Sequence, residues 1–74
     1  MIVSKLQALL TAHGMSRREC ARRSRLNINT VCSLANGATR MIDLGTLDQL
    51  CATLQVQPGE VFVWEPDPQQ DEAG

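Results

Sequence analysis

The sequence has almost no aromatic residues and no long apolar run. Phe62 and Trp64 are its only aromatic side chains among 74 residues, so a core must be built from aliphatic side chains, which suits packed helices. No run approaches the roughly 18 apolar residues that a membrane span needs, and no signal-peptide pattern opens the chain. A chain this short predicts one domain with a small core and little room for a catalytic cavity.

The chain also has few metal-binding and nucleophilic side chains. Its three cysteines, Cys20, Cys32 and Cys51, are spaced by 12 and 19 residues, which fits no disulfide framework and no paired-ligand zinc motif. His13 is the single histidine. Since paired carboxylates and a phosphate-binding glycine loop are missing too, the sequence predicts no metal, no cofactor and no enzyme. We expect a reducing, cytoplasmic setting, with Cys20 and Cys51 buried as small hydrophobic side chains.

Basic residues are absent from the second part of the chain. Residues 1–42 contain seven basic residues and one acidic residue, a balance of +6, whereas residues 43–74 contain seven acidic residues and carry −7. The basic residues are Lys5, Arg17, Arg18, Arg22, Arg23, Arg25 and Arg40. This asymmetry indicates one side that faces a polyanion and another that is solvated or pairs with itself. An ordinary solvated surface is the alternative.

The spacing of apolar residues predicts an all-α chain, a compact bundle of four or five helices. The predicted helices span about residues 2–13, 17–24, 28–35, 43–54 and 58–62. The run from Val61 to Trp64 has an alternative as an edge strand or a dimer contact. We expect residues 1–65 to form the domain and residues 66–74 to form a disordered acidic tail.

Inward stripes and capping residues define these helices. The stripes are Ile2, Leu6, Leu9, Leu10 and His13 in the first helix, and Leu44, Leu47, Leu50, Cys51 and Leu54 in the fourth. Ser16 and Glu19 have the spacing of a capping box. Asn27 and Asp43 are predicted N-caps, and Gly37 is predicted to end the third helix.

Residues 15–37 are the most informative stretch. Two short helices flank a break of about three residues, and the small Ala21 lets them cross closely, which is the helix-turn-helix layout. With Val31 facing the core, the step of about 100° per residue turns Asn29 and Ser33 outward. The whole outward face comprises Ile28, Asn29, Cys32, Ser33 and Asn36.

This face carries no charge, which is unusual for a solvated helix. Its amide, hydroxyl and methyl groups are those that match base edges in a DNA major groove. A protein–protein contact remains an alternative, as does packing of Ile28 at the rim of the core.

At these positions the sequence resembles the Cro- and phage-repressor-type helix-turn-helix family, also called the XRE family. The resemblance is carried by Met15–Ala21, Leu26–Leu34, Asn36–Gly37, Ile42–Cys51 and Leu54–Phe62. It covers about residues 2–64. The resemblance implies a five-helix domain that binds operator DNA, usually as a homodimer, with its third helix in the major groove.

The resemblance also implies roles for individual residues. The base-reading positions are Ile28, Asn29 and Ser33, with Cys32 adjacent. The phosphate-contacting positions are Arg17, Asn27, Asn36, Thr39 and Arg40, and the arginine cluster of the second helix adds Arg18. Apart from the resemblance, the acidic half should face away from DNA, and there the dimer contact is expected from Val61, Val63 and Trp64.

Four residues depart from the family pattern. Arg25 occupies a turn position commonly held by Gly, and a side chain at positive φ costs about 1 kcal/mol or more, so we expect a rearranged turn. Cys20 replaces a Leu and thins the core. Ala35 replaces a Glu and removes a salt bridge to the second helix. Arg17 replaces a Gln, which should raise phosphate affinity more than specificity.

The sequence therefore predicts a sequence-specific regulator of transcription that binds double-stranded DNA. Most simply it is a repressor that occupies its operator as a homodimer, with residues 27–36 in the major groove. We expect a bacterial or phage-encoded protein associated with the nucleoid. The alternative is a protein-interaction module, such as an antitoxin that uses the same fold. Oxidation of Cys32 is a further hypothesis for the control of DNA binding.

Overall fold

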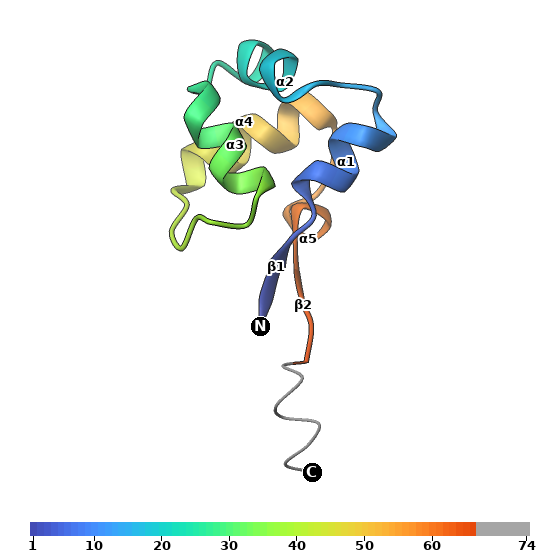
Figure 1. Cartoon of the computed structure of the whole chain (residues 1–74), viewed down its shortest axis with the longest axis vertical. Helices are drawn as coiled ribbons and strands as arrows, with labels where there is room; N and C mark the ends of the chain where they lie inside the picture. The colour runs from blue at the N-terminus through green and yellow to red at the C-terminus, as the bar shows by residue number, and fades with distance from the viewer. Residues whose placement is uncertain (67–74) are drawn as a thin grey trace.

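Five helices and two short strands make up the chain in a computed structural model, which describes residues 1–66. The elements are β1 (Ile2–Ser4), α1 (Leu6–Ala12), α2 (Arg17–Ser24), α3 (Ile28–Ala35), α4 (Leu44–Leu54), α5 (Pro58–Val61) and β2 (Phe62–Trp64). The predicted helical fold is confirmed, with a small sheet added to it (Figure 1). The predicted acidic tail is residues 66–74, and all of it except Pro66 lies outside the described residues.

The sheet joins the two ends of the described chain. β1 and β2 run antiparallel, with Ile2 opposite Trp64 and Ser4 opposite Phe62. The prediction of a first helix starting at residue 2 was therefore wrong, because β-branched residues there suit extended backbone and the strand at residues 62–64 satisfies their backbone groups. The amide of Lys5 then donates to the Val61 carbonyl at 2.7 Å, just before α1 begins. The edge-strand alternative for the end of the chain is confirmed.

The core is aliphatic and draws on α1, α2, α3 and α4. Its buried residues are Leu6, Leu10, Cys20, Ala21, Val31, Leu34, Leu50 and Leu54. Full burial of each leucine stabilises the fold by about 1.5–3 kcal/mol relative to exposure. The thin side chain of Cys20 is fully buried as predicted.

Three members of the predicted inward stripes lie elsewhere. Ile2 is 65% exposed because it belongs to the strand, and Leu44 is 81% exposed because α4 enters the core only after its first turn. His13 is also exposed, yet its ring is fixed. Nδ1 lies 2.8 Å from the Leu9 carbonyl and Nε2 lies 3.0 Å from the Leu54 carbonyl, so the ring links the ends of α1 and α4.

The predicted caps start α2, α3 and α4. The Ser16 hydroxyl accepts the amide N–H of Glu19 at 3.0 Å, although the Glu19 side chain turns to arginines of α2 instead of completing a capping box. The Asp43 carboxylate accepts the amides of Gly45 and Thr46 at 2.6 and 3.1 Å. Those bonds, the one from Thr46 foremost, lower the pKa of the Asp43 carboxyl.

Two of the three cysteines, Cys20 and Cys51, have thiols whose pKa is raised. Burial raises the pKa of the Cys20 thiol. Cys51 is half-buried rather than buried, and its thiol pKa is raised by desolvation and then by the negative charges of Asp48 and Glu60. Within residues 1–66, no three His, Cys, Asp or Glu side chains gather as a metal site would require. None of the helices in this described part is long and apolar enough to cross a membrane.

Candidate nucleic-acid interface

The turn between α2 and α3 keeps a left-handed residue although glycine is absent. Arg25 has φ 61° and ψ 32°, so the expected rearrangement of the turn was wrong. Two backbone bonds hold the turn: Arg25 N–H donates to the Arg22 carbonyl at 3.4 Å and Leu26 N–H donates to the Ala21 carbonyl at 3.0 Å. Leu26 also packs against the core. These contacts offset the roughly 1–2 kcal/mol that a side chain pays in this conformation.

Small buried residues of α2 set its close approach to α3. Ala21 is buried, and its single methyl group lets the two helices cross as the sequence predicts. Ser24 is fully buried, and its hydroxyl donates to the Cys20 carbonyl at 2.6 Å, so the polar atom is satisfied. Because α3 packs against α2 and the core through one side, its opposite, outer side lies at the surface of the molecule.

The outer side of α3 has the predicted composition. Val31 and Leu34 are buried, and none of the five outward residues is charged. Ile28, Asn29 and Asn36 are exposed, whereas Cys32 and Ser33 are half-buried.

The two asparagines at the start of α3 have different hydrogen bonding. The Asn27 side-chain oxygen accepts the Asn29 amide at 2.8 Å, which caps the helix, and within residues 1–66 the Asn27 NH₂ group donates to no other residue. The side chain of Asn29 makes no hydrogen bond to any residue of the described part. Both its donor and its acceptor are therefore available to a ligand.

Arg17 is fixed between two other helices. Its Nε donates to Gln7 Oε1 of α1 at 2.8 Å and its Nη2 donates to Asn36 Oδ1 at the end of α3 at 2.9 Å. A guanidinium has five N–H donors, so three remain for a phosphate. Sequence reasoning missed Gln7, because no periodic signal links it to a residue ten positions later.

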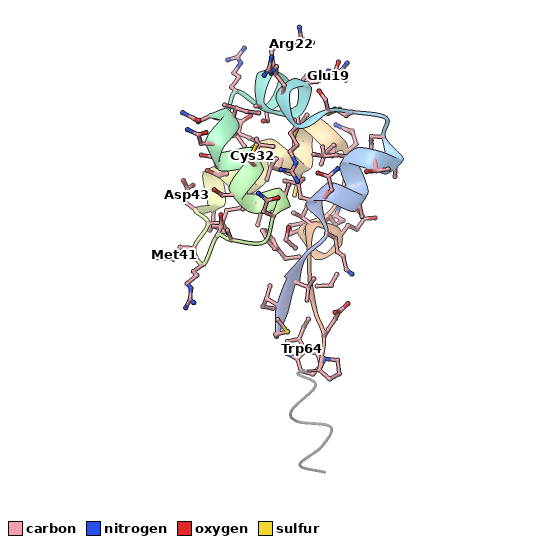
Figure 2. The ribbon with its side chains drawn as sticks, in the orientation of Figure 1. Glu19, Arg22, Cys32, Met41, Asp43 and Trp64 are labelled. Atoms are coloured by element: carbon pink, nitrogen blue, oxygen red, sulfur yellow. The ribbon has the colours of Figure 1, made fainter. Side chains whose placement is uncertain are left out.

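The other arginines of α2 divide into two groups. Arg22 and Arg23 both approach Glu19 Oε1, at 3.6 and 3.0 Å. Arg18 is exposed and has no carboxylate within salt-bridge distance in residues 1–66. Figure 2 shows Glu19 and Arg22 at the end of the molecule formed by α2, far from Trp64 at the sheet.

The remaining predicted phosphate contacts lie in the loop between α3 and α4. Thr39 and Arg40 are exposed there, and Gly37 starts the loop with φ 72°. Only glycine adopts that conformation without steric cost. Arg40, like Arg18, has no acidic partner among the described residues.

The predicted dimer residues differ in exposure. Val61 is fully buried, so it has no surface to offer to another protein. Val63 is half-buried and Trp64 is 63% exposed. Any contact at this end of the chain therefore depends on the strand that follows α5 and not on α5 itself.

Comparison with known proteins identifies this arrangement. A sequence model for the Cro/C1-type HTH DNA-binding domain matches residues 5–67. The chain belongs to the Cro/C1-type HTH family. It is 29% identical, over 66 residues, to the uncharacterized HTH-type transcriptional regulator YozG of Bacillus subtilis strain 168, covering 89% of this chain and 79% of YozG. As a family member it is a DNA-binding protein of transcription regulation.

A solved structure supports the fold independently. The chain superposes on a Bacteroides fragilis protein, whose crystal structure was described as that of a candidate DNA-binding protein, with a TM-score of 0.72. The match covers 84% of this chain and 98% of the other, at 18% sequence identity. At that identity the likeness speaks for the fold alone.

Proposed function

We propose that the protein is a sequence-specific regulator that occupies operator DNA, most simply as a repressor, with α3 in the major groove. The observation that carries the proposal is the uncharged outer face of α3, on which Ile28, Asn29 and Asn36 are exposed, beside a guanidinium that is fixed against the end of the same helix. Such a face suits base edges, and the cation beside it suits a phosphate. No catalytic role is part of the proposal.

The proposed base readers follow from their chemistry. Asn29 has an amide with free donor and acceptor groups, which can form two hydrogen bonds with adenine. Ser33 can pair with several bases, and Ile28 can meet a thymine methyl group. Cys32 lies next to them on the helix.

The proposed phosphate contacts surround this face. They are Arg17, Arg18, Asn27, Asn36, Thr39 and Arg40. Asn27 and Asn36 use their side-chain oxygens within the protein, so their NH₂ groups are the parts that would donate to DNA. Each neutralised phosphate releases counterions and makes binding more sensitive to salt.

We further propose that the protein binds DNA as a homodimer. Two copies would read half-sites about 34 Å apart, one turn of the duplex. Its setting would be the nucleoid of a bacterial cytoplasm, whether its gene is bacterial or phage-borne. The relation to YozG, which is named an HTH-type transcriptional regulator, supports the regulatory role.

Asn29→Ala tests the base-reading role on a duplex selected for binding. We expect the free energy of binding to fall by about 1–3 kcal/mol for each half-site, through one base pair of that half-site, with relaxed preference at that pair. Gln49→Ala removes an amide from another exposed position, on α4, and should leave binding unchanged. Fluorescence anisotropy with the selected duplex and with its single-base variants gives both the loss of affinity and the change in base preference. An equal loss on every sequence would refute the base contact.

A further inference from the structure

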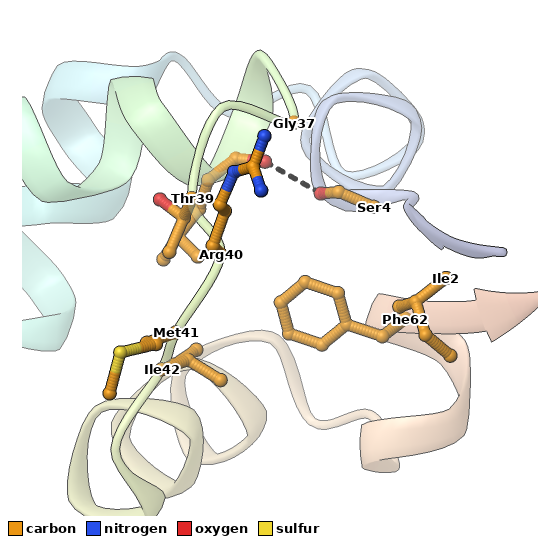
Figure 3. A pocket seen from close by; sticks show the side chains of 9 residues that line it. Ile2, Ser4, Gly37, Thr39, Arg40, Met41, Ile42 and Phe62 are labelled. Atoms are coloured by element: carbon orange, nitrogen blue, oxygen red, sulfur yellow. Dashed lines mark hydrogen bonds between the residues drawn. The ribbon is translucent and has the colours of Figure 1, made fainter.

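A groove lies between the small sheet and the loop that joins α3 to α4. Its volume is about 520 Å³, within the range of about 300–1,000 Å³ over which proteins hold small molecules. Figure 3 shows the loop residues Arg40, Met41 and Ile42 on one side of this groove, with Ile2 and Phe62 of the sheet on the other. The size of the groove therefore suits a small molecule.

Most of the groove wall is apolar, and part of it is exposed. Side chains alternate along a strand, so the register of the sheet places Ile2 and Phe62 on the one face that lines the groove. Ile2 is 65% exposed, and Met41, which also lines the groove, is 87% exposed. Apolar surface gains free energy when a ligand removes it from water, so these walls favour the hydrocarbon part of a ligand.

Arg40 is the one charged side chain among the described residues that line the groove. No carboxylate of residues 1–66 lies within salt-bridge distance of its guanidinium. Asp43, the nearest acidic residue along the chain, uses its carboxylate to cap α4. Glu65 pairs with Lys5 at 3.3 Å, and strand alternation puts both on the other face of the sheet. The groove therefore presents a cation that no described acid neutralises.

Backbone hydrogen bonds hold the loop beside the groove at its two ends. Ala38 N–H donates to the Ser33 carbonyl at 2.9 Å, and Asp43 accepts the first amides of α4. Between these points the amides of residues 39–42 donate to no residue of the described part. A segment with few backbone hydrogen bonds rearranges at low cost in free energy. The part of the loop that carries Arg40 can therefore move toward a ligand.

We propose that this groove binds a small organic acid with a hydrocarbon chain, whose carboxylate pairs with Arg40 and whose chain lies between the sheet and Ile42. A planar guanidinium holds a carboxylate through two parallel hydrogen bonds, and the apolar walls beside it gain from covering a chain. An apolar ligand without a charge would leave the cation unpaired, and an acid without a chain would leave the walls in water. The combination of one cation with apolar walls thus specifies the class of ligand.

The site would make DNA binding respond to this acid. Arg40 is also a proposed phosphate contact, and this consequence alone rests on the proposed function. Guanidinium N–H groups that hold a ligand carboxylate are not available to a DNA phosphate, and the negative charge of the ligand cancels that of the side chain. The acid would therefore weaken DNA binding, as an inducer of a repressor does.

Isothermal titration calorimetry of the full chain with sodium octanoate, without DNA, tests the site. We expect one saturable site per chain. Octylammonium and acetate should each bind more weakly by about tenfold or more, because each lacks one of the two matching parts.

Two pairs of variants place octanoate in the groove. Arg40→Gln should weaken its binding by about tenfold, whereas Arg18→Gln removes an exposed cation of α2 that also has no acidic partner in residues 1–66 and should change nothing. Ile2→Ser should weaken binding by about fourfold or more. Leu44→Ser, at a position that is 81% exposed and outside the groove, is its control. Circular dichroism of each variant reports whether it is folded.

Four results would overturn the inference. They are heats that never saturate, an affinity for octylammonium equal to that for octanoate, and an effect of Arg18→Gln as large as that of Arg40→Gln in folded variants. The fourth is octanoate binding that disappears as the protein concentration rises, because a second copy of the chain would then occupy the groove.

Fluorescence anisotropy with a duplex selected for binding tests the consequence for DNA separately. At constant sodium concentration, octanoate should weaken DNA binding by the parent chain about as much as Arg40→Gln does, and should leave the variant unchanged. Acetate should affect neither. Octanoate that binds the chain without changing its DNA affinity would overturn the link to DNA and leave the site in place. A chain that binds octanoate and no DNA would overturn the proposed function alone.

Discussion

The outer face of α3 and the exposed face of the sheet are both uncharged, yet they differ in chemistry. The α3 face consists of small amide, hydroxyl and thiol side chains with one exposed isoleucine. The sheet face exposes two large side chains, Ile2 and Trp64, beside a groove. Small polar groups distinguish one base pair from another, whereas a large ring gains most from leaving water. Two exposed surfaces of one small domain thus suit two kinds of partner.

Charge separates the two surfaces further. The α3 face is bordered by Arg17, which donates to Asn36, whereas the sheet ends beside Glu65 and Lys5, which pair with each other. Arg40, in the loop after α3, lies beside the groove that adjoins the sheet. The net charge of −1 therefore says little about partners, because it sums a basic region and an acidic region.

Leu34→Ala should have the largest effect, because Leu34 supports both surfaces. Its side chain is buried in the core and its carbonyl accepts the Ser4 hydroxyl at 2.6 Å. We expect a loss of about 2–5 kcal/mol in the free energy of unfolding, measured by chemical denaturation. Leu44→Ala, at an exposed position, should stay within about 0.5 kcal/mol. Equal effects at the two positions would contradict the assigned core.

Arg17→Ala separates phosphate contact from base reading. We expect weaker binding by a similar factor on all sequences, and a salt dependence whose log–log slope is flatter by about one unit. Arg23→Ala, which removes a guanidinium 3.0 Å from Glu19, serves as the control and should change the slope less. A slope that Arg17→Ala leaves unchanged would exclude the phosphate contact.

Arg25→Gly should stabilise the turn between α2 and α3. Arg25 has φ 61°, where glycine avoids a steric cost of about 1–2 kcal/mol. Part of that gain is lost to the larger entropy of an unfolded glycine, about 0.5–1 kcal/mol. We therefore expect a net gain of about 0.5–1 kcal/mol by thermal unfolding, with unchanged DNA specificity. A less stable variant would mean that the arginine side chain itself supports the turn.

Asp43→Asn should have the smallest effect, visible only in acid. Hydrogen bonds from Thr46 and Gly45 lower the pKa of this carboxyl in the folded state, so its stabilisation is complete above the unfolded pKa, about 3.9, and is lost as the pH falls through the folded value. Asparagine caps a helix about as well and does not titrate. Stability of the variant should match the parent at neutral pH and fall less steeply in acid. If the free energy of unfolding fell as steeply in acid for Asp43→Asn as for the parent chain, this contribution of the Asp43 carboxylate would be excluded.

The sequence predicted what local rules determine. The first residues of α2 and α3 follow from Ser16 and Asn27, whose side chains accept backbone N–H groups two or three residues later. The outer face of α3 follows from helical periodicity around Val31. Contacts between distant segments were not predictable in this way. Three-residue strands carry too short a pattern to distinguish from a helix start, so the pairing of Ile2 with Trp64 was missed. Arg25 was misjudged because its backbone contacts and Leu26 offset a local cost.

The same distinction applies to the candidate site. The outward position of Asn29 follows from the helix alone, whereas the link from Arg17 to Gln7 and Asn36 requires three helices to meet. The burial of Val61 likewise depends on how α5 packs. A sequence therefore indicates which residues lie on the outer face of a helix better than it indicates how neighbouring helices hold them in place.

Selection of binding sites from a pool of random duplex DNA tests the central claim most directly. The account predicts enrichment of a palindromic site whose half-sites lie about one helical turn apart. It also predicts that Asn29→Ala, put through the same selection, loses its preference at one position of each half-site. A pool that stays random, or the same enriched site with Asn29→Ala as with the parent chain, would contradict base reading by α3.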